Sequence, residues 1–320
     1  MTTEIGKVSG LCLGSNVFGW TADEQASFAL LDAFVDAGGT MLDTADSYMF
    51  RAEGNSGGES ETIIGNWLAA RPGVRDRVQI ATKVGQLPVR RGLGPENVAA
   101  AAEDSLRRLR TDRIDLYYAH DDDAAVPQAD YLAAFDRLVA DGKVLATGAS
   151  NFSAGRLRSA QEIAAAEGLT RFAAVQPHYN LMERDYEAEL ALVAETEGLA
   201  CFPYFGLAKG FLTGKYRPGA DGAVDSGATS GAMASARAEG ARAYLDDPRA
   251  EKVLAVLDEV ADAHRVAPAA VALAWLDEQP TVAAPIASGR TTDQLARILP
   301  ALTLRLAPTE LAALSDASAS

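Results

Sequence analysis

The chain has 320 residues, of which 48% are hydrophobic and 23% are charged, as in ordinary soluble globular enzymes. Its 29 basic and 44 acidic residues give a net charge of −15. This charge argues against a nucleic-acid or anionic-membrane partner, because both need a basic surface. Two cysteines, Cys12 and Cys201, cannot make a disulfide framework, and their apolar surroundings predict buried free thiols. With no signal peptide and no apolar stretch of about 18 residues, we expect a cytoplasmic protein.

Short apolar runs alternate with segments of helical spacing along the whole chain. The runs predict eight strands, at residues 8–13, 40–44, 78–83, 113–119, 144–149, 172–176, 199–204 and 281–286. Helix start signals stand at Asp23, Pro95 and Ser153, and Asp141–Gly142 is a stop signal. Strands alternating with helices predict parallel β/α units. No G-x-G-x-x-G follows the first strand, so we favour a (β/α)8 barrel over a doubly wound open sheet, with residues 1–320 as one domain.

Two connections are longer than usual for such units. They span residues 48–58 and 215–244, and both follow the carboxyl end of a predicted strand, where barrel enzymes build their sites. A long loop at this end is either a lid or a surface segment, and we favour the lid.

Four polar residues stand at the ends of three successive predicted strands. Asp43 ends the second strand and Tyr48 follows it, Lys83 ends the third and His120 the fourth. Only six of the 29 basic residues are lysines, and Lys83 lies inside an apolar run, where an unpaired ammonium costs several kcal/mol. Asp43 on the adjacent strand is its expected partner. Since parallel strand ends share one face of a barrel, the four side chains are expected to converge there.

Several sequence segments match one known family. They are LDTADSY at 42–48, IATKV at 80–84, DLYYAHDDD at 115–123, GGESETIIG at 57–65, GASNFS at 148–153, VQPHYNLMER at 175–184, GFLTGKYR at 210–217 and PIASGRTTDQL at 285–295. With these the chain resembles the aldo-keto reductase family, including its bacterial NADPH-dependent members and potassium-channel β-subunits. The resemblance implies a (β/α)8 barrel that binds NADP(H) and reduces an aldehyde or ketone to an alcohol.

The catalytic roles follow from the charge that carbonyl reduction builds on the substrate oxygen. That oxygen needs a proton donor and preorganised hydrogen-bond donors. Tyr48 is the candidate general acid, and we expect the Lys83 ammonium to lower its pKa while Asp43 holds Lys83 charged. His120 is expected to orient the carbonyl, as its family counterpart does. Trp20, Tyr48 and His120 are the candidate substrate contacts, with Met49, Tyr118 and His178 as further candidates for the pocket wall.

The resemblance also implies a set of cofactor-binding positions. Ser150, Asn151 and Gln176 match residues that bind the nicotinamide carboxamide, and Tyr204 matches the aromatic that stacks on the ring. Those expected near the ribose, pyrophosphate, 2′-phosphate and adenine are Ser15, Asn16, Asp43, Phe205, Leu207, Lys209, Lys215, Ser288, Arg290 and Gln294. Arg290 suits a phosphate, which favours NADP over NAD.

Two positions depart from the family pattern. Gly206 stands where a proline is frequent, which loosens a turn. Arg297 and Ile298 replace a Glu-Asn pair that contacts adenine, so the choice between NADP and NAD is open; we expect Arg297 on a helix surface. Asp121, Asp122 and Asp123 are consecutive in a loop and do not predict a metal site, because adjacent side chains do not converge on one ion.

Two other functions remain open at the level of the sequence. Lys83 could instead form a Schiff base in an aldolase, although that reading leaves the cofactor positions unexplained. A non-enzymatic, redox-sensing binding subunit is the second alternative. We expect a monomer or a weak homo-oligomer that acts on a small carbonyl compound. The sequence identifies neither the particular substrate nor the physiological direction of the reaction.

Overall fold

The computed structural model describes residues 5–6, 8–217 and 238–319 of the chain. In this part of the chain, eight parallel strands alternate with helical segments. The strands are β1 (Cys12–Gly14), β2 (Met41–Asp43), β3 (Gln79–Val84), β4 (Ile114–Ala119), β5 (Val144–Ser150), β6 (Ala174–Gln176), β7 (Ala200–Cys201) and β8 (Ile286–Ala287).

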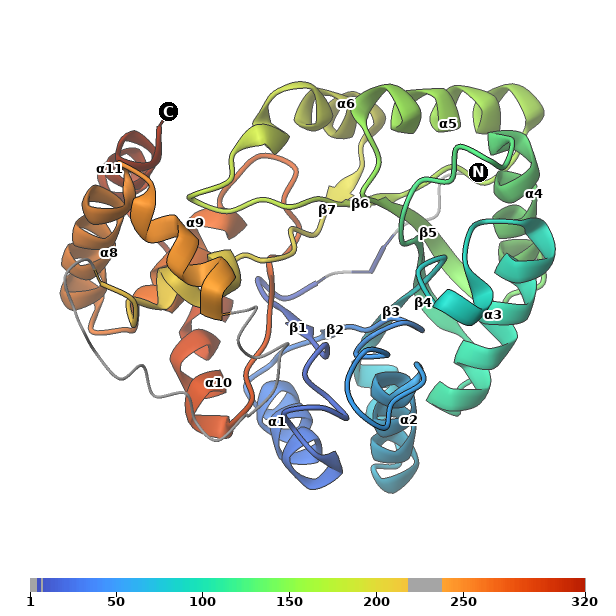
Figure 1. Cartoon of the computed structure of the whole chain (residues 1–320), viewed down its shortest axis with the longest axis horizontal. Helices are drawn as coiled ribbons and strands as arrows, with labels where there is room; N and C mark the ends of the chain where they lie inside the picture. The colour runs from blue at the N-terminus through green and yellow to red at the C-terminus, as the bar shows by residue number, and fades with distance from the viewer. Residues whose placement is uncertain (1–4, 7, 218–237, 320) are drawn as a thin grey trace.

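The strands form one sheet that closes on itself. Their order is β7-β6-β5-β4-β3-β2-β1-β8, and every pairing is parallel. The Cys201 amide donates to the Thr281 carbonyl, and the Ala283 amide donates to the Cys201 carbonyl, each at 2.8 Å. These two bonds join β7 to the segment that leads into β8. The predicted (β/α)8 barrel is therefore confirmed, and Figure 1 shows its strands at the centre with the helices around them.

The helices carry the capping residues that the sequence predicts. The side chains of Asp23 and Ser153 accept hydrogen bonds from the first turns of two helices, Pro95 begins a third, and Asp141 ends a fourth. The described helices are α1 (Glu24–Asp36), α2 (Glu59–Ala70), α3 (Pro95–Leu109), α4 (Gln128–Ala140), α5 (Ala154–Glu167), α6 (Glu189–Glu197), α8 (Ala250–His264), α9 (Pro268–Asp277), α10 (Thr292–Ile298) and α11 (Pro308–Ser318).

The hydrophobic core has two layers. The larger one lies between the barrel and the helices, where the apolar faces of the helices pack against the strands. The smaller one fills the barrel and includes Cys12, Met41, Leu116, Tyr118 and Phe202. Cys12 and Cys201 are free and buried, as predicted. Because apolar side chains fill the barrel, polar chemistry is confined to its ends.

The first and last strands differ from the prediction. Residues 281–286 are not a regular strand, because Thr281 has a left-handed backbone (φ 67°) and Pro285 has no amide to donate; β8 begins only at Ile286. Residues 8–11 are likewise irregular, since the Ser9 amide bonds the Thr40 side chain rather than a neighbouring main chain. Closure of the barrel thus relies on a few main-chain bonds near Cys201 and Ile286.

The structure describes the first of the two long connections completely and the second only in part. Residues 48–58, all of them described, contain no helix or strand. The Asn55 amide bonds the Gly19 carbonyl, which ties the connection to the loop after β1, and the Met49 carbonyl within the connection itself. Most of the second connection, residues 218–237, lies outside the described residues, so its predicted role as a lid stays untested. Among the described helices, none is long and apolar enough to cross a membrane.

Candidate active site

Lys83 is the centre of a buried hydrogen-bond network at the carboxyl ends of β2 and β3. Its Nζ lies 2.7 and 2.8 Å from the two carboxylate oxygens of Asp43 and 2.6 Å from the hydroxyl of Tyr48. It also donates to the carbonyl of Thr44 at 2.7 Å, and the Tyr48 hydroxyl donates to Asp43 at 2.6 Å. The expected pairing of Asp43 with Lys83 is therefore present, with Tyr48 held against both.

The sheet register explains this convergence. Asp43 pairs with Ala81, so the side chain of Lys83, two residues further along β3, points into the barrel on the same face as Asp43. Main-chain pairing continues past β2, because the Thr44 amide donates to Ala81 and the Asp46 amide to Lys83. This pairing holds the turn that carries Tyr48 beside Lys83.

The pKa of Tyr48 differs from the sequence-based expectation. Burial, followed by the charge of Asp43 and its hydrogen bond, raises the pKa of the Tyr48 phenol well above its usual value, so the prediction of a lowered pKa is wrong for this structure. Burial also lowers the pKa of Lys83, while Asp43 opposes that effect. The phenol therefore keeps its proton at neutral pH and is available as a donor.

His120 lies beside Tyr48 at the end of β4. The two rings meet edge to face, with their centres 6.1 Å apart, and the His120 Nδ1 is 3.4 Å from the Ser47 hydroxyl. Burial, and secondarily the Lys83 charge, lowers the pKa of His120 well below its usual value. The imidazole is therefore neutral at pH 7, with one nitrogen available to donate.

Gln176 and Ser150 bond to the protein in this structure. The Gln176 amide nitrogen donates to Asp43 across the barrel at 2.9 Å, and the Ser150 hydroxyl donates to the Gln176 carbonyl at 2.9 Å. Both side chains are buried. The structure thus brings Gln176 to the same carboxylate as Lys83, a contact that the sequence did not predict.

Tyr204, Asn151 and His178 form an aromatic and amide cluster at the barrel rim. Tyr204 lies flat against the His178 ring, with centres 5.3 Å apart and planes 8° apart, and its hydroxyl donates to the Asn151 side chain at 2.9 Å. The Asn151 amide in turn donates to the His120 carbonyl. Tyr204 is thereby fixed in orientation next to the catalytic candidates.

The segment after Tyr204 has an unusual backbone. Phe205, Ala208 and Lys209 have left-handed φ angles of 54°, 47° and 58°, and Gly210 follows at 103°. Such conformations cost of order 1–3 kcal/mol each for residues other than glycine and tend to cluster at functional sites. Leu207 precedes the 3₁₀ helix η4 (Ala208–Thr213) within this segment.

Three basic side chains lie around this segment. Lys209 stands over the rings of Phe205 and Tyr244, and Lys215 stands over Tyr216 with its Nζ near Gly210. Arg290 is close enough to Tyr216 for its charge to act on that phenol. The structure therefore gathers the basic residues that the sequence assigned to phosphate groups.

The remaining cofactor candidates lie where β1 meets β8. The Ser288 hydroxyl donates to Asn16, and the Arg290 amide donates to the Gln294 side chain, each at 2.9 Å. Ser15 is buried, and its hydroxyl bonds the Asp43 carbonyl and Ser60, so its side chain has a structural role here. Gly14 is needed at this junction, because an added Cβ would lie 2.7 Å from the Ser288 hydroxyl oxygen.

The structure shows the surroundings of the two departures from the family pattern and of two candidate pocket residues. A Cβ on Gly206 would approach Leu273 and Leu276 to 3.0 and 3.2 Å, so this glycine allows α9 to pack closely. Arg297 is exposed on α10, as expected. Tyr118, considered for the pocket wall, is instead fully buried inside the barrel, where its ring covers Gly148. Trp20 is partly exposed in the loop after β1.

Two of the three consecutive aspartates bind protein groups. Asp122 pairs with Arg156 at 2.6 Å, and Asp123 accepts hydrogen bonds from the amides of Leu93 and Ala125. In the described part of the chain, no three His, Cys, Asp or Glu side chains are grouped so that they could hold a metal ion.

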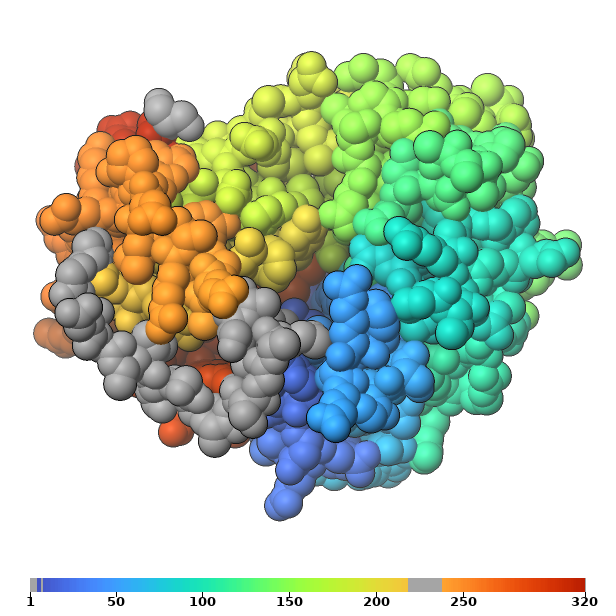
Figure 2. Space-filling view, in the orientation of Figure 1, coloured from blue at the N-terminus to red at the C-terminus, as the bar shows by residue number. Residues whose placement is uncertain are grey.

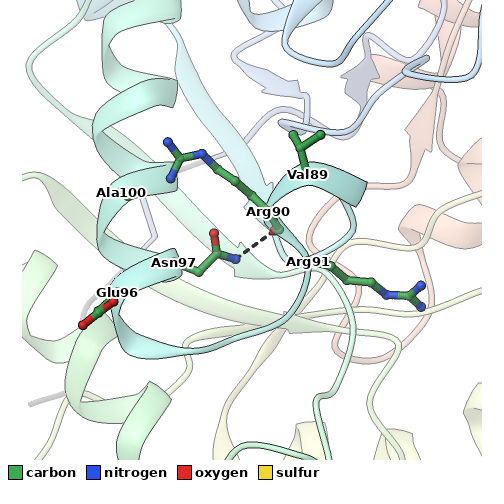
Figure 3. Close-up of a pocket in the computed structure, with 6 residues that line it drawn as sticks. All are labelled: Val89, Arg90, Arg91, Glu96, Asn97 and Ala100. Atoms are coloured by element: carbon green, nitrogen blue, oxygen red, sulfur yellow. Dashed lines mark hydrogen bonds between the residues drawn. The ribbon is translucent and has the colours of Figure 1, made fainter.

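Of two hollows in the described part of the chain, only one is lined by residues of the site. Figure 2 shows the viewed face hollowed near its centre, between the light-blue segment after β2 and the yellow segment after β7. A hollow of about 200 Å³ includes Asn151, Gln176 and His178 in its lining. A broader one of about 690 Å³ lies over the 3₁₀ helix η2 (Pro88–Arg90) and the start of α3, but Figure 3 shows Arg90 and Arg91 pointing away from each other there. Because its polar groups do not converge, the broader hollow is not the candidate site.

Comparison with known proteins identifies the family. The aldo/keto reductase family model matches residues 10–319. The chain belongs to the aldo/keto reductase family. It is an oxidoreductase of that family, as the resemblance in its motifs predicted.

Individual relatives are similar over nearly the whole chain. The uncharacterized oxidoreductase YrpG of Bacillus subtilis is 34% identical over 97% of this chain and 92% of its own length. Norsolorinic acid reductase stcV of Emericella nidulans is 33% identical over 97% of this chain and 78% of its own. An aryl-alcohol dehydrogenase [NADP(+)] of Phanerodontia chrysosporium is 32% identical over 92% of this chain and 77% of its own. These relatives are named as oxidoreductases, which agrees with the family.

Sequence reasoning missed two participants at the site. The Ser47 hydroxyl approaches His120, and Asp46 is buried beside the strand that carries Lys83. Both lie inside the LDTADSY segment, so their position between Asp43 and Tyr48 was the available signal. Their side chains were not predictable as site residues, because which face of a turn is buried depends on packing from α2 and β4.

Proposed function

We propose that the protein is an NADP(H)-dependent reductase that converts an aldehyde or ketone into an alcohol, with Tyr48 as the proton donor. The observation that carries the proposal is the 2.6 Å contact between the Lys83 ammonium and the Tyr48 hydroxyl, inside a network anchored by Asp43. This network supports proton donation to a carbonyl oxygen that becomes negatively charged.

Lys83 gives Tyr48 its capacity to release a proton. The raised pKa of Tyr48 keeps the phenol protonated before reaction, and an ammonium at 2.6 Å stabilises the phenolate that is left behind. Asp43 keeps Lys83 charged, and the Thr44 carbonyl and Tyr48 hydroxyl complete the hydrogen bonds of its ammonium. The network therefore holds the donor and the positive charge in one fixed geometry.

His120 is proposed to orient the carbonyl. Its ring is neutral and stands edge-on to Tyr48, so a substrate oxygen between the two would accept from both. Ser47 near the Nδ1 atom supports this orientation. Trp20 from the loop after β1 remains the proposed apolar contact on the substrate.

The basic cluster fits the phosphates of NADP(H). In a chain of net charge −15, Lys209, Lys215 and Arg290 gather around the left-handed segment at Gly210 and around Tyr216. Such a local concentration of cations favours an anionic ligand. An arginine can bind a phosphate group through two hydrogen bonds, which favours NADP(H) over NAD(H) at Arg290. Asn16, Ser288 and Gln294 lie alongside as proposed polar contacts to the nucleotide end.

The nicotinamide end is proposed to lie at the rim formed by Tyr204, Asn151, Ser150 and Gln176. Tyr204 offers a fixed aromatic face, and the amides of Asn151 and Gln176 are suited to a carboxamide. When bound, the cofactor supplies the hydride that the protein itself lacks. Phe205 and Leu207 would flank the link between the two ends.

The substrate class proposed for first tests is an aromatic aldehyde or ketone. Two similar proteins are named for norsolorinic acid reduction and for aryl-alcohol dehydrogenation with NADP(+). The hollow of about 200 Å³ at Asn151, which Phe152, Tyr186 and Leu190 also line, offers apolar surface beside the proposed nicotinamide site. Together these observations support a substrate with a flat apolar body and one carbonyl.

Fluorescence titration with NADPH and with NADH tests the cofactor proposal. We expect tryptophan quenching at micromolar NADPH and much weaker binding of NADH, and the variant Arg290→Met should bring the two affinities together. Arg297→Met is the matched control, because Arg297 is an exposed arginine on the nearby helix α10. Equal affinities in the wild type would contradict NADP selectivity, and tight binding of neither would contradict the cofactor site.

The aldolase alternative finds little support in the geometry. Lys83 is fully buried, and its nitrogen is occupied by Asp43, Thr44 and Tyr48, whereas Schiff-base formation needs a neutral and accessible amine. Borohydride treatment with a carbonyl compound should therefore leave Lys83 unmodified. Stable capture of a membrane-protein partner would instead revive the binding-subunit alternative.

A further inference from the structure

His178 covers one face of the Tyr204 ring at the barrel rim. The two ring planes are 8° apart and their centres are 5.3 Å apart, which is an offset stack. The main chain also joins the two residues, since the Tyr204 amide donates to the Pro177 carbonyl at 2.9 Å. At its other end the partly exposed Tyr204 donates its hydroxyl to Asn151, at 2.9 Å. The Tyr204 ring therefore has one covered face and one fixed end.

Phe205 lies beside this stack and not over the second face of Tyr204. Its ring is inclined by 76° to His178 and by 75° to Tyr204, and its centre is 5.4 and 5.2 Å from theirs. The three ring centres thus form a nearly equilateral triangle. A ring on the second face of Tyr204 would be much farther from His178 than from Tyr204. Neither His178 nor Phe205 therefore covers that face.

Asn180 fixes the orientation and the protonation of His178. Asn180 is fully buried, and its Oδ1 accepts from the amides of Met182 at 2.8 Å and Glu183 at 3.2 Å. Its Nδ2 then faces the Phe205 carbonyl at 3.0 Å and the Nε2 of His178 at 3.4 Å. Because an amide nitrogen only donates, the His178 Nε2 accepts and the ring proton is on Nδ1. Burial lowers the pKa of His178, which agrees with a neutral ring.

We propose, building on the reductase function above, that His178 is a positioning residue for the nicotinamide ring: it closes one face of Tyr204 and leaves the opposite face for stacking. His178 touches no part of the cofactor in this arrangement and acts only through Tyr204. Because His178 and Asn151 already hold the Tyr204 ring, less freedom is lost when a second ring stacks on it. The flat shape of the imidazole is the property that matters, so another flat ring should replace it.

The test is calorimetric titration with two ligands, NADPH and 2′-phospho-ADP-ribose, which lacks the nicotinamide. His178→Leu removes the flat ring but keeps an apolar side chain of similar size. We expect its affinity for NADPH to fall about 3- to 10-fold, the scale of one aromatic contact, and its affinity for 2′-phospho-ADP-ribose to stay within about 2-fold of the wild type. His178→Phe, which restores a flat ring, should bind both ligands nearly as the wild type does.

His264→Leu is the matched control. His264 is a partly buried histidine whose Nε2 is 3.0 Å from both carboxylate oxygens of Glu310, in a contact that joins α8 to α11. This variant should lose stability without a change in either affinity. His178→Ala is a second variant without a ring, and it tests the same effect if His178→Leu does not fold. A purely structural role for His178 would weaken the binding of both ligands alike.

The outcomes separate this inference from the proposed function. Unchanged NADPH affinity in His178→Leu and His178→Ala, or an equal loss for both ligands, would overturn the role of His178 while leaving the reductase proposal intact. A loss in His178→Phe as large as that in His178→Leu would also overturn it, because a flat ring would then not be what is needed. No binding of NADPH by the wild type would overturn the proposed function and this inference with it. A loss confined to NADPH and reversed in His178→Phe would support both.

Discussion

The amide of Gln176 on β6 donates a hydrogen bond to the carboxylate of Asp43 on β2, across the barrel, at 2.9 Å. Asp43 thereby accepts from three sources: the Lys83 ammonium, the Tyr48 hydroxyl and Gln176. The carboxylate is the common anchor of the candidate catalytic residues and of one residue proposed to bind the cofactor.

Loss of the Gln176 amide should lower the free energy of unfolding of the protein. Gln176→Met removes a hydrogen bond to a buried charged group, which is worth about 1.5–3 kcal/mol. We expect the free energy of unfolding, measured with urea at neutral pH, to fall by that amount. Gln176→Glu should cost more at neutral pH than at low pH, since it puts a carboxylate against Asp43. Unchanged stability in both variants would contradict the cross-barrel bond.

Removing the lysine should leave a buried, uncompensated carboxylate. Lys83→Met is expected to lower the free energy of unfolding by about 3–5 kcal/mol, as for other buried pairs that lose one partner. The double variant Asp43→Asn/Lys83→Met should lose less than Lys83→Met alone, because the stranded charge is gone. Urea unfolding of the wild type, the two single variants Lys83→Met and Asp43→Asn, and the double variant measures the coupling. Additive losses would show that the two side chains do not interact.

The raised pKa of Asp46 predicts that the difference in stability between Asp46→Asn and the wild type depends on pH. The pKa of Asp46 is raised by folding, so the ionised form is disfavoured in the folded state. Stability from this group is fully present below about pH 4 and declines as the pH rises to about 7. The stability advantage of Asp46→Asn over the wild type should therefore grow across this window, by up to about 4 kcal/mol, and then stay constant. Parallel stability curves for the two proteins would rule out a raised pKa.

Two helical glycines, one closely packed and one not, test the packing of α2 against α3. A Cβ on Gly65 in α2 would lie 2.0 Å from the Arg108 carbonyl oxygen, whereas one on Gly155 in α5 meets nothing within 4 Å. Gly65→Ala should destabilise the protein by about 1–3 kcal/mol through overpacking. Gly155→Ala should stabilise it by about 0.5–1 kcal/mol, because alanine is the better helix former. Thermal unfolding of both variants checks the pair, and equal effects would contradict the close α2–α3 packing.

The alternation of strands and helices, and with it the barrel, was predictable because apolar periodicity and capping residues are local signals. The convergence of Asp43, Tyr48, Lys83 and His120 followed from their common place at strand ends. The irregular segment at 281–285 was not predictable from hydrophobicity, because its outcome depends on the left-handed Thr281 and on Pro285.

Contacts that join distant parts of the chain could not be predicted from the sequence pattern. Gln176 and Asp43 are 133 positions apart, and their bond depends on the width of the closed barrel. The raised pKa of Tyr48 also had no local signal, since it results from burial and from the charge and hydrogen bond of Asp43. Asp46 lay inside a recognised motif, but its burial depends on elements distant in the sequence, among them Glu61 of α2 and Arg108 of α3, which act on its charge.

Comparison of Tyr48→Phe with the wild type, by single-turnover oxidation of bound NADPH in the presence of an aromatic aldehyde, tests the central claim most directly. The ring of Tyr48 and its packing are retained, and only the hydroxyl bonded to Lys83 and Asp43 is lost. The account predicts nearly unchanged NADPH affinity and a rate at least about 100-fold lower, the usual scale of a general acid. A Tyr48→Phe rate close to that of the wild type would contradict it.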